Sequence, residues 1–205
     1  MGDPSGYVSR GGLKLRHALD EFGVDPAGLW GADLGCSTGG FTDVLIRAGA
    51  ERVFAVDTAY GELAWTLRQH ERVVVMERSN ALHVDAPGEV VARGGVDLVV
   101  IDLGWTPQSR AIPAALKWLN DAGRIITLIK PHYERTEAEK KAGGVVDDAA
   151  AEAIAERVAR DLPKLGVRVV GLAVSPIRGG AKGKKKKGTG NLEWLALVER
   201  DRPGR

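Results

Sequence analysis

Residues 31–45 read GADLGCSTGGFTDVL and place three glycines, an acid and a cysteine between two apolar segments. The apolar residues before the glycines predict a buried strand, and those after them predict a helix. Glycine at such a junction lets another group come very close to the backbone. The segment therefore predicts a strand, a tight loop and a helix, with a ligand beside the loop.

The rest of the chain repeats this alternation of strand-like and helix-like segments. Nearly continuous apolar strands separated by helices indicate a mostly parallel sheet that is covered on both faces. Only a Lys/Gly-rich segment separates the last two strands, so they are expected to form an antiparallel hairpin. The predicted fold is α/β, a doubly wound seven-stranded sheet with strands at 29–35, 52–57, 72–77, 96–102, 124–130, 167–174 and 191–199. Helices are expected at 11–23, 40–50, 61–70, 107–121 and 147–164, and a linker ends at Gly95.

Length and composition are those of an ordinary globular chain, with 205 residues, 44% hydrophobic and 27% charged. We expect a single domain over 1–205 with flexible ends at 1–8 and 200–205. No apolar run reaches the roughly 20 residues that span a bilayer, and the start lacks a secretory signal. The single cysteine, Cys36, excludes an internal disulfide, so the expected location is cytoplasmic and no membrane partner is expected.

Positive charge is concentrated at one place in the chain. The formal net charge is only +2, yet residues 175–191 carry six lysines and arginines and no acid. The remainder of the chain is therefore net acidic. This composition predicts a basic loop over 176–190 that would attract an anionic partner at one place.

The glycine loop lies where doubly wound folds bind ligands, at the carboxyl end of the first strand. Its spacing differs from the Gly-x-Gly-x-x-Gly of dinucleotide folds. Asp33 precedes the loop, and Asp57 ends the next strand, where an acid accepts both hydroxyls of an adenosine ribose. S-adenosylmethionine (SAM) has no phosphates, so these acids are compatible with it. The expected SAM-binding residues are Asp33, Gly35, Ser37, Thr38, Gly39, Gly40, Phe41, Asp57, Asn80 and Asp102.

Two of these features also have a structural interpretation. The glycines could instead close a tight strand–helix corner, although the sequence favours a ligand there, and Asn80 is as well explained as a turn residue. The parallel sheet with a final hairpin nevertheless suits a class I, Rossmann-like SAM-dependent methyltransferase better than a dehydrogenase.

Several segments resemble the FtsJ-like RNA methyltransferases, most closely the TlyA branch. They read YVSRGGLKLRHALDEFGV, GCSTGGFTDVLIRAGAERVFAVDTAYGELAW, LRQHERVVVMERSNA and LIKPHYE. The resemblance implies a class I fold, SAM as cofactor, and methylation of ribose 2′-hydroxyls. The implied partner is RNA, in this family typically ribosomal RNA or a ribosomal subunit.

The family's catalytic signature is a Lys-Asp-Lys-Glu tetrad, and the resemblance places it at Lys14, Asp102, Lys130 and Glu193. A ribose hydroxyl is a poor nucleophile, so its proton must be removed or its developing charge stabilised, and a lysine does either. We expect Lys130 to be the central group, with Asp102 beside it. Lys14 and Glu193 would orient the nucleotide. No metal is expected, because the four histidines form no ligand-spaced cluster.

Basic residues are the candidates for RNA contact, since phosphates are held without reading sequence. They are Arg10, Arg16, Lys182, Lys184, Lys185, Lys186 and Lys187, although a solubilising loop is the alternative for the lysines. Two features depart from the TlyA branch. Its N-terminal RNA-binding module is not expected here, and LGWTPQSR follows Asp102. Trp105 in that segment is expected either to stack on a flipped-out base or to pack in the core, whereas Trp65 and Trp118 are expected in the core.

Three other functions remain open from the sequence. A SAM-dependent methyltransferase of a small molecule or protein has the same cofactor loop. A non-catalytic RNA-binding relative would keep the fold, and an NAD-dependent dehydrogenase is disfavoured by the glycine spacing. The oligomeric state is not determined by the sequence.

Overall fold

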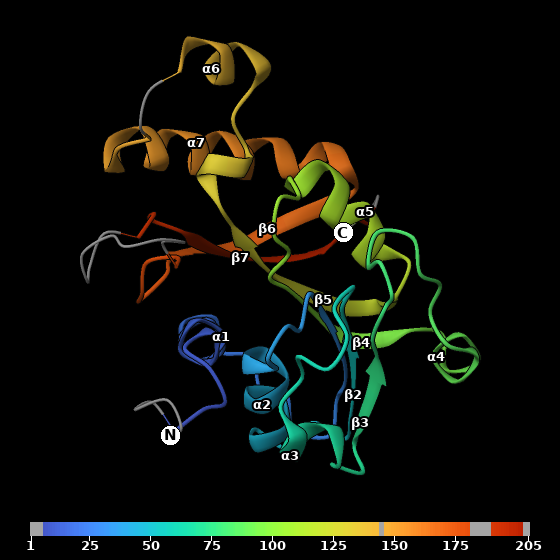
Figure 1. Cartoon of the computed structure of the whole chain (residues 1–205). Coiled ribbons are helices and arrows are strands. Elements are labelled where there is room, and N and C mark those ends of the chain that lie inside the picture. Colours follow the sequence, from blue (N-terminus) through green and yellow to red (C-terminus); the bar gives the residue numbers. More distant parts are fainter. Residues whose placement is uncertain (1–5, 144–145, 181–189, 203–205) are drawn as a thin grey trace.

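The computed structural model describes residues 6–143, 146–180 and 190–202. Within these ranges seven strands form one sheet in the order β3-β2-β1-β4-β5-β7-β6 (Figure 1). Neighbours from β3 to β5 run parallel, and β7 pairs antiparallel with both β5 and β6. The predicted fold class and the final hairpin are confirmed. The strands are β1 (Trp30–Leu34), β2 (Arg52–Val56), β3 (Val73–Met76), β4 (Val96–Ile101), β5 (Leu119–Ile129), β6 (Val167–Val174) and β7 (Trp194–Arg200).

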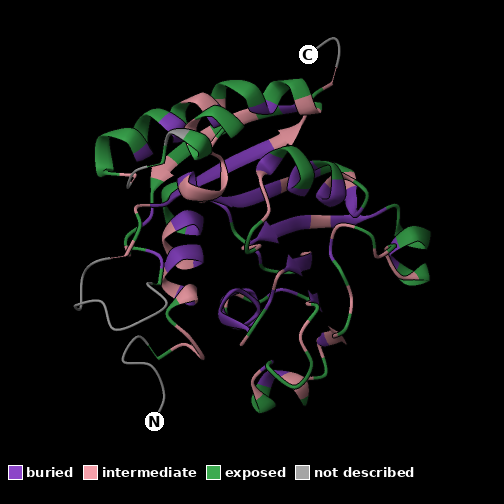
Figure 2. Ribbon diagram, turned by 45° about the horizontal axis from the view of Figure 1, so that its top comes forward, coloured by how far each residue is buried: buried purple, intermediate pink, exposed green. Residues whose placement is uncertain are grey.

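Helices cover both faces of this sheet, as Figure 1 shows, and Figure 2 shows the buried strands between them. They are α1 (Gly11–Glu21), α2 (Gly40–Arg47), α3 (Trp65–Arg68), α4 (Gly88–Arg93), α5 (Gln108–Leu116), α6 (Glu137–Ala142) and α7 (Asp148–Asp161), with 3-10 turns η1 (Pro131–Tyr133) and η2 (Leu162–Leu165).

The core consists of two apolar layers, one on each face of the sheet. Along β2, Val53 and Ala55 pack with residues of α1, α2 and α3, whereas Phe54 and Val56 pack with residues of α4, α5 and α7. Successive side chains of a strand point to opposite faces, so a strand buried on both faces is apolar throughout. This explains the unbroken apolar runs of the sequence.

Three predicted elements have different lengths in the structure. The helix expected at 61–70 is reduced to the single turn of α3, because Ala64 is extended and donates its N–H to the carbonyl of Thr38. The expected linker before Gly95 contains the short helix α4. Strand β5 begins five residues earlier than expected, where its pairing with β4 shifts register.

The two ends of the described chain are tied to the fold. The N–H of Val8 donates to Asp43 Oδ2 at 2.9 Å, and Arg200 belongs to β7. The remaining parts of both expected flexible ends, 1–5 and 203–205, lie outside the described residues. Across the described ranges, no helix combines the length and the apolar composition that crossing a membrane requires.

The topology brings distant residues to one edge of the sheet. Parallel strands end at the same edge, and antiparallel β7 begins there. The residues that directly follow β1, β2, β4 and β5, and the residue that directly precedes β7, are therefore neighbours in space. They are Gly35, Asp57, Asp102, Lys130 and Glu193.

Candidate active site

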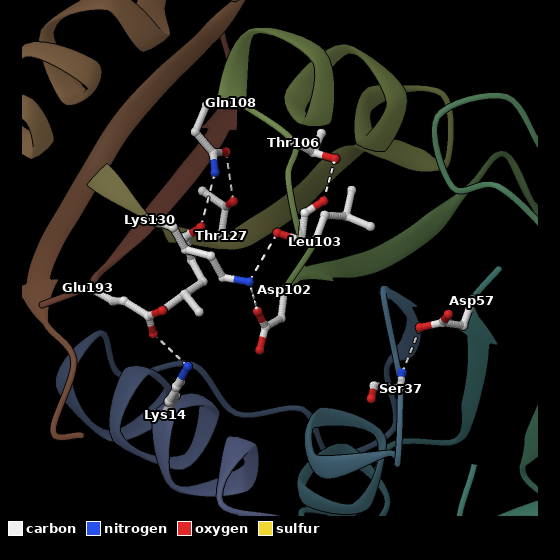
Figure 3. A network of polar contacts seen from close by, with 12 residues as sticks. Lys14, Ser37, Asp57, Asp102, Leu103, Thr106, Gln108, Thr127, Lys130 and Glu193 are labelled. Carbon is white, nitrogen blue, oxygen red and sulfur yellow. Dashed lines mark hydrogen bonds and ion pairs between the residues drawn. The ribbon is translucent and has the colours of Figure 1, made fainter. Parts of the chain in front are cut away.

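A cavity of about 780 Å³ opens at this edge of the sheet. All four residues of the expected tetrad line it. Figure 3 shows that they come from four elements far apart in the chain and form two ion pairs. Lys14 lies on α1, which packs against both α2 and β7 and so reaches the same edge.

The first pair joins Lys130 and Asp102. The Lys130 ammonium is ion-paired with Asp102 Oδ1, and its Nζ also donates to the carbonyl of Leu103 at 3.0 Å. An ammonium has three N–H donors, whereas a neutral amine has two and a lone pair. After these two contacts one position on Nζ therefore remains for another group in either protonation state. Both side chains are partly exposed to the cavity.

The second pair joins Lys14 and Glu193 and is almost fully buried. Lys14 Nζ donates to Glu193 Oε2 at 2.6 Å, and the two side chains are 10% and 4% exposed. Gly179 leaves the space that the carboxylate occupies, because a Cβ on Gly179 would collide with Glu193 Oε1. A buried charge pair of this kind costs desolvation free energy that its attraction barely offsets. Stability alone is thus a poor explanation for it.

Asp57 organises the opposite side of the cavity. The backbone N–H groups of Ser37 and Ala59 donate to its two carboxylate oxygens at 2.8 Å each. Each carboxylate oxygen has a second acceptor site, to which a ligand hydroxyl could donate. Ser37, Asn80 and Asp57 all line the cavity, as do Gly35, Thr38, Gly40 and Phe41. Asn80 also closes a turn by accepting from the N–H of Leu82 at 3.0 Å, which agrees with its interpretation as a turn residue.

Asp33 is placed differently from the expectation. It is fully buried beneath the loop and does not line the cavity among the described residues. The Thr42 hydroxyl donates to its Oδ2 at 2.6 Å, while Oδ1 has no hydrogen-bond partner within the described part of the chain. Burial raises the pKa of Asp33 to about 7. A contact of Asp33 with a ligand in the cavity is not supported by this position.

The loop glycines are packed against the protein itself. A Cβ on Gly35, at φ +92°, would lie 2.9 Å from the carbonyl of Asp102. One on Gly39, at φ +96°, would meet Leu63 and Leu67, and one on Gly40 would lie 2.9 Å from the backbone nitrogen of Gly12. Gly39 does not line the cavity. The expectation that the glycines make room for a ligand is therefore wrong for Gly39, and the tight-corner interpretation explains it.

The candidate RNA-binding residues fall into three groups. Arg10 lines the cavity, whereas Arg16 is held by Asp20, to which its Nε donates at 2.9 Å. Lys182, Lys184, Lys185, Lys186 and Lys187 lie outside the described residues. The chain leaves the described part at Gly180 and returns before Asn191, and both of these residues line the cavity.

The sequence did not indicate a buried polar cluster around Gln108. The Gln108 side chain donates from Nε2 to the carbonyl of Leu128 at 3.1 Å and accepts at Oε1 from the Thr127 hydroxyl. The backbone N–H of Gln108 donates to the Glu134 carboxylate at 2.8 Å. A lone glutamine after a proline resembles an ordinary helix start, so no local signal marks it. The cluster fixes the beginning of α5 to β5 (Figure 3).

Cys36 and the described histidines bear on two other kinds of site, a thiol nucleophile and a metal centre. Cys36 is buried at the cavity wall, and burial raises the pKa of its thiol further above the usual range, which makes it a poor nucleophile. Within the described ranges, no three His, Cys, Asp or Glu residues are grouped so that they would hold a metal ion.

The side chains that line the cavity have the chemistry that SAM binding requires. Asp57 and Asp102 give it acidic walls, which suit a positively charged sulfonium ligand without phosphates. Asp57 offers carboxylate acceptors for ribose hydroxyls, and Phe41 adds an apolar surface. Asp57 and Phe41 line the same cavity as the two lysine–carboxylate pairs.

The chain is similar to known methyltransferases in sequence and to solved structures in fold. Residues 7–185 match the FtsJ-like methyltransferase family. The chain is 43% identical over 192 residues to the 16S/23S rRNA (cytidine-2′-O)-methyltransferase TlyA of Mycobacterium tuberculosis, covering 92% of this chain and 67% of that protein. A solved protein from Streptococcus thermophilus is 35% identical with a TM-score of 0.84, covering 98% of this chain and 70% of that one.

The chain thus spans about two thirds of the length of these relatives. The fold alone is shared with a SAM-dependent methyltransferase from Mesorhizobium loti, at 14% identity and a TM-score of 0.60 over 90% of this chain and 96% of that one. The chain belongs to the FtsJ-like methyltransferase family, and it is an enzyme whose cofactor is SAM.

Proposed function

We propose that the chain methylates ribose 2′-hydroxyls of RNA, and that its substrate is ribosomal RNA. The observation that carries the proposal is the arrangement of two lysine–carboxylate pairs around one cavity beside the cofactor loop. Similarity to the 16S/23S rRNA (cytidine-2′-O)-methyltransferase TlyA of Mycobacterium tuberculosis supports the same reaction and substrate. Action on ribosomal RNA agrees with the expected cytoplasmic location.

The cofactor side of the cavity has a defined set of residues. Asp57 would accept the ribose hydroxyls, and Asn80 would contact the adenine edge. Gly35, Ser37, Thr38, Gly40 and Phe41 would line the remaining surface. SAM supplies a methyl group on a positively charged sulfur. Asp102 lines the same cavity and is ion-paired with Lys130, so it would face the reacting region.

Lys130 would activate the hydroxyl. Its two existing contacts fix the direction of Nζ, and its remaining position is a lone pair or a third N–H. A lone pair would accept the hydroxyl proton, whereas an N–H would stabilise the developing alkoxide. Both actions need the same placement of the hydroxyl, with its oxygen within hydrogen-bond distance of Nζ.

The Lys14–Glu193 pair would position the nucleotide. Each side chain locks the other, so both present a fixed surface to the cavity. Holding the hydroxyl in line with the methyl group lowers the entropic part of the barrier. This role needs rigidity, which explains why a costly buried pair occupies the position.

The direct test supplies tritiated SAM to the purified protein with total RNA, total protein or a metabolite extract. Label is expected in RNA, and nuclease digestion should release it. Label that survives nuclease and appears in the protein or metabolite fraction would show that the substrate class is wrong.

The lysines of the basic loop are proposed to hold RNA phosphates. Replacing Lys182, Lys184, Lys185, Lys186 and Lys187 by glutamine should weaken RNA binding and reduce its salt dependence, since each phosphate contact to a single strand contributes a slope of about 0.7. SAM affinity should stay unchanged. Isothermal titration with RNA at several salt concentrations measures the slope. An equal loss of SAM affinity would instead indicate that the loop supports folding.

A further inference from the structure

Two aromatic rings stand together at the cavity beside Lys130. Trp105 follows β4 and is 80% exposed, and Tyr133 ends η1 and is half-buried. Their ring centroids are 4.9 Å apart with an interplanar angle of 36°, and both residues line the cavity. Exposing most of an indole to water forgoes the free energy that burying it would gain. The expectation that Trp105 packs in the core is wrong, and an open aromatic surface remains.

The backbone at Trp105 is also unusual. Its φ of +56° lies in the left-handed region, which bulky side chains rarely adopt and which clusters at functional sites. Both ends of the loop are fixed, because the Leu103 carbonyl accepts from Lys130 and Gln108 is bound to β5. The loop therefore holds the indole in place, and it does so at a cost in backbone strain.

The position of this surface relative to Lys130 suggests what covers it. Lys130 Nζ lies 5.9 Å from the centroid of the Tyr133 ring, and the tilted Trp105 ring neighbours the Tyr133 ring. In a nucleoside, the base is attached to the carbon adjacent to the one that bears the 2′-hydroxyl. A ribose whose hydroxyl reaches Lys130 would thus carry its base toward the two rings. Stacking between aromatic side chains and bases is the common way proteins hold unpaired RNA bases.

We propose that Trp105, supported by Tyr133, is the positioning residue on which the base of the target nucleotide stacks. The proposal rests on the proposed RNA substrate and assigns one residue to its recognition. Every base has a flat face, so this contact favours an unpaired nucleotide without selecting its identity. It predicts that the target nucleotide must leave its helix to react.

The test compares Trp105→Ala and Trp105→Phe with the unchanged protein. The probes are a fluorescein-labelled twelve-nucleotide uridine RNA and an abasic ribose-phosphate chain of the same length, both at low salt. Trp105→Ala should bind the uridine RNA about tenfold more weakly, as expected for one lost base stack. Trp105→Ala and the unchanged protein should bind the abasic chain equally. Trp105→Phe should recover most of the affinity for the uridine RNA. Trp65→Ala is the matched control, because Trp65 is 70% exposed yet lies outside the cavity wall.

The kinetic readout separates positioning from folding. With ribosomal RNA as substrate, Trp105→Ala should raise KM more than it lowers kcat, while the Kd for SAM stays unchanged. An unchanged affinity for the uridine RNA, or an equal loss for the abasic chain, would overturn the stacking role. If base-dependent binding is lost as predicted but no RNA is methylated by the unchanged protein, the proposed reaction fails and the stacking surface stands.

Discussion

Lys130→Ala should lower the rate of methyl transfer by about 10²–10⁴-fold, the range for losing one acid–base or electrostatic group. The Lys130 side chain is held by Asp102 and by the Leu103 carbonyl, which leaves one hydrogen-bonding position on Nζ for the substrate hydroxyl. No other described lysine has this arrangement. The fold should persist, because Lys130 lies after the end of β5 and its strand remains paired on both sides. A single-turnover assay with tritiated SAM measures the loss.

The controls for this variant separate chemistry from folding and binding. Lys117→Ala removes an exposed lysine at the end of α5 and should leave the rate unchanged. Lys130→Arg keeps a positive charge that proteins do not deprotonate. If Lys130 works as a base, the arginine variant should be as inactive as the alanine variant, and partial activity would indicate an electrostatic role. Near-normal turnover in Lys130→Ala, with intact SAM binding, would remove Lys130 from the mechanism.

Glu193→Ala should destabilise the protein by about 3–5 kcal/mol, since it leaves the Lys14 ammonium buried without its partner. The pair is joined at 2.6 Å and nearly inaccessible to water. Urea unfolding followed by circular dichroism measures the free energy of unfolding. The variant should also lose methyl transfer, because the nucleotide would no longer meet a fixed surface.

A matched ion pair in β7, the strand that directly follows Glu193, is available as a control. Glu199 of β7 pairs with Arg168 at the same distance of 2.6 Å, but their side chains are 33% and 63% exposed. Glu199→Ala should cost about 1 kcal/mol or less, because solvent screens exposed pairs. The double variant Lys14→Met and Glu193→Met should recover stability, since removing both charges avoids an unpaired one. The double variant should still lack methyl transfer. Recovery of methyl transfer together with stability would show that the Lys14–Glu193 pair is purely structural.

Much of the site was accessible from the sequence because it lies at strand ends. The alternation of strands and helices predicts a parallel sheet, and a parallel sheet brings the residues after its strands to one edge. Asp57, Asp102 and Lys130 each follow an apolar strand directly, so their proximity could be expected. Glu193 joins them only because β7 is antiparallel and begins at that edge.

The errors arise where a contact between distant segments overrides a local pattern. The amphipathic pattern around Trp65 predicts a long helix with a core tryptophan. In the structure the segment is shortened by the bond of Ala64 to Thr38, and Trp65 is exposed. Asp33 has the expected position in the chain, but it is fully buried, does not line the cavity and accepts a hydrogen bond from Thr42. No pattern in either segment reveals these contacts.

Trp118 shows the opposite case. The sequence predicts it in the core, and in the structure it is fully buried and packs against Phe54. Trp105 could not be assigned, because its left-handed backbone depends on the contacts that fix both ends of its loop. A sequence pattern carries no information on such a strained conformation.

The most direct measurement locates the transferred methyl group within the RNA. A methyl on the 2′-oxygen blocks alkaline cleavage of the neighbouring phosphodiester bond, whereas a methyl on a base does not. After reaction with tritiated SAM and alkaline hydrolysis, the label should therefore appear in alkali-resistant dinucleotides, and Lys130→Ala should form them at least about a hundredfold more slowly. Label found only in single methylated nucleotides would contradict the assignment of the ribose hydroxyl as the acceptor.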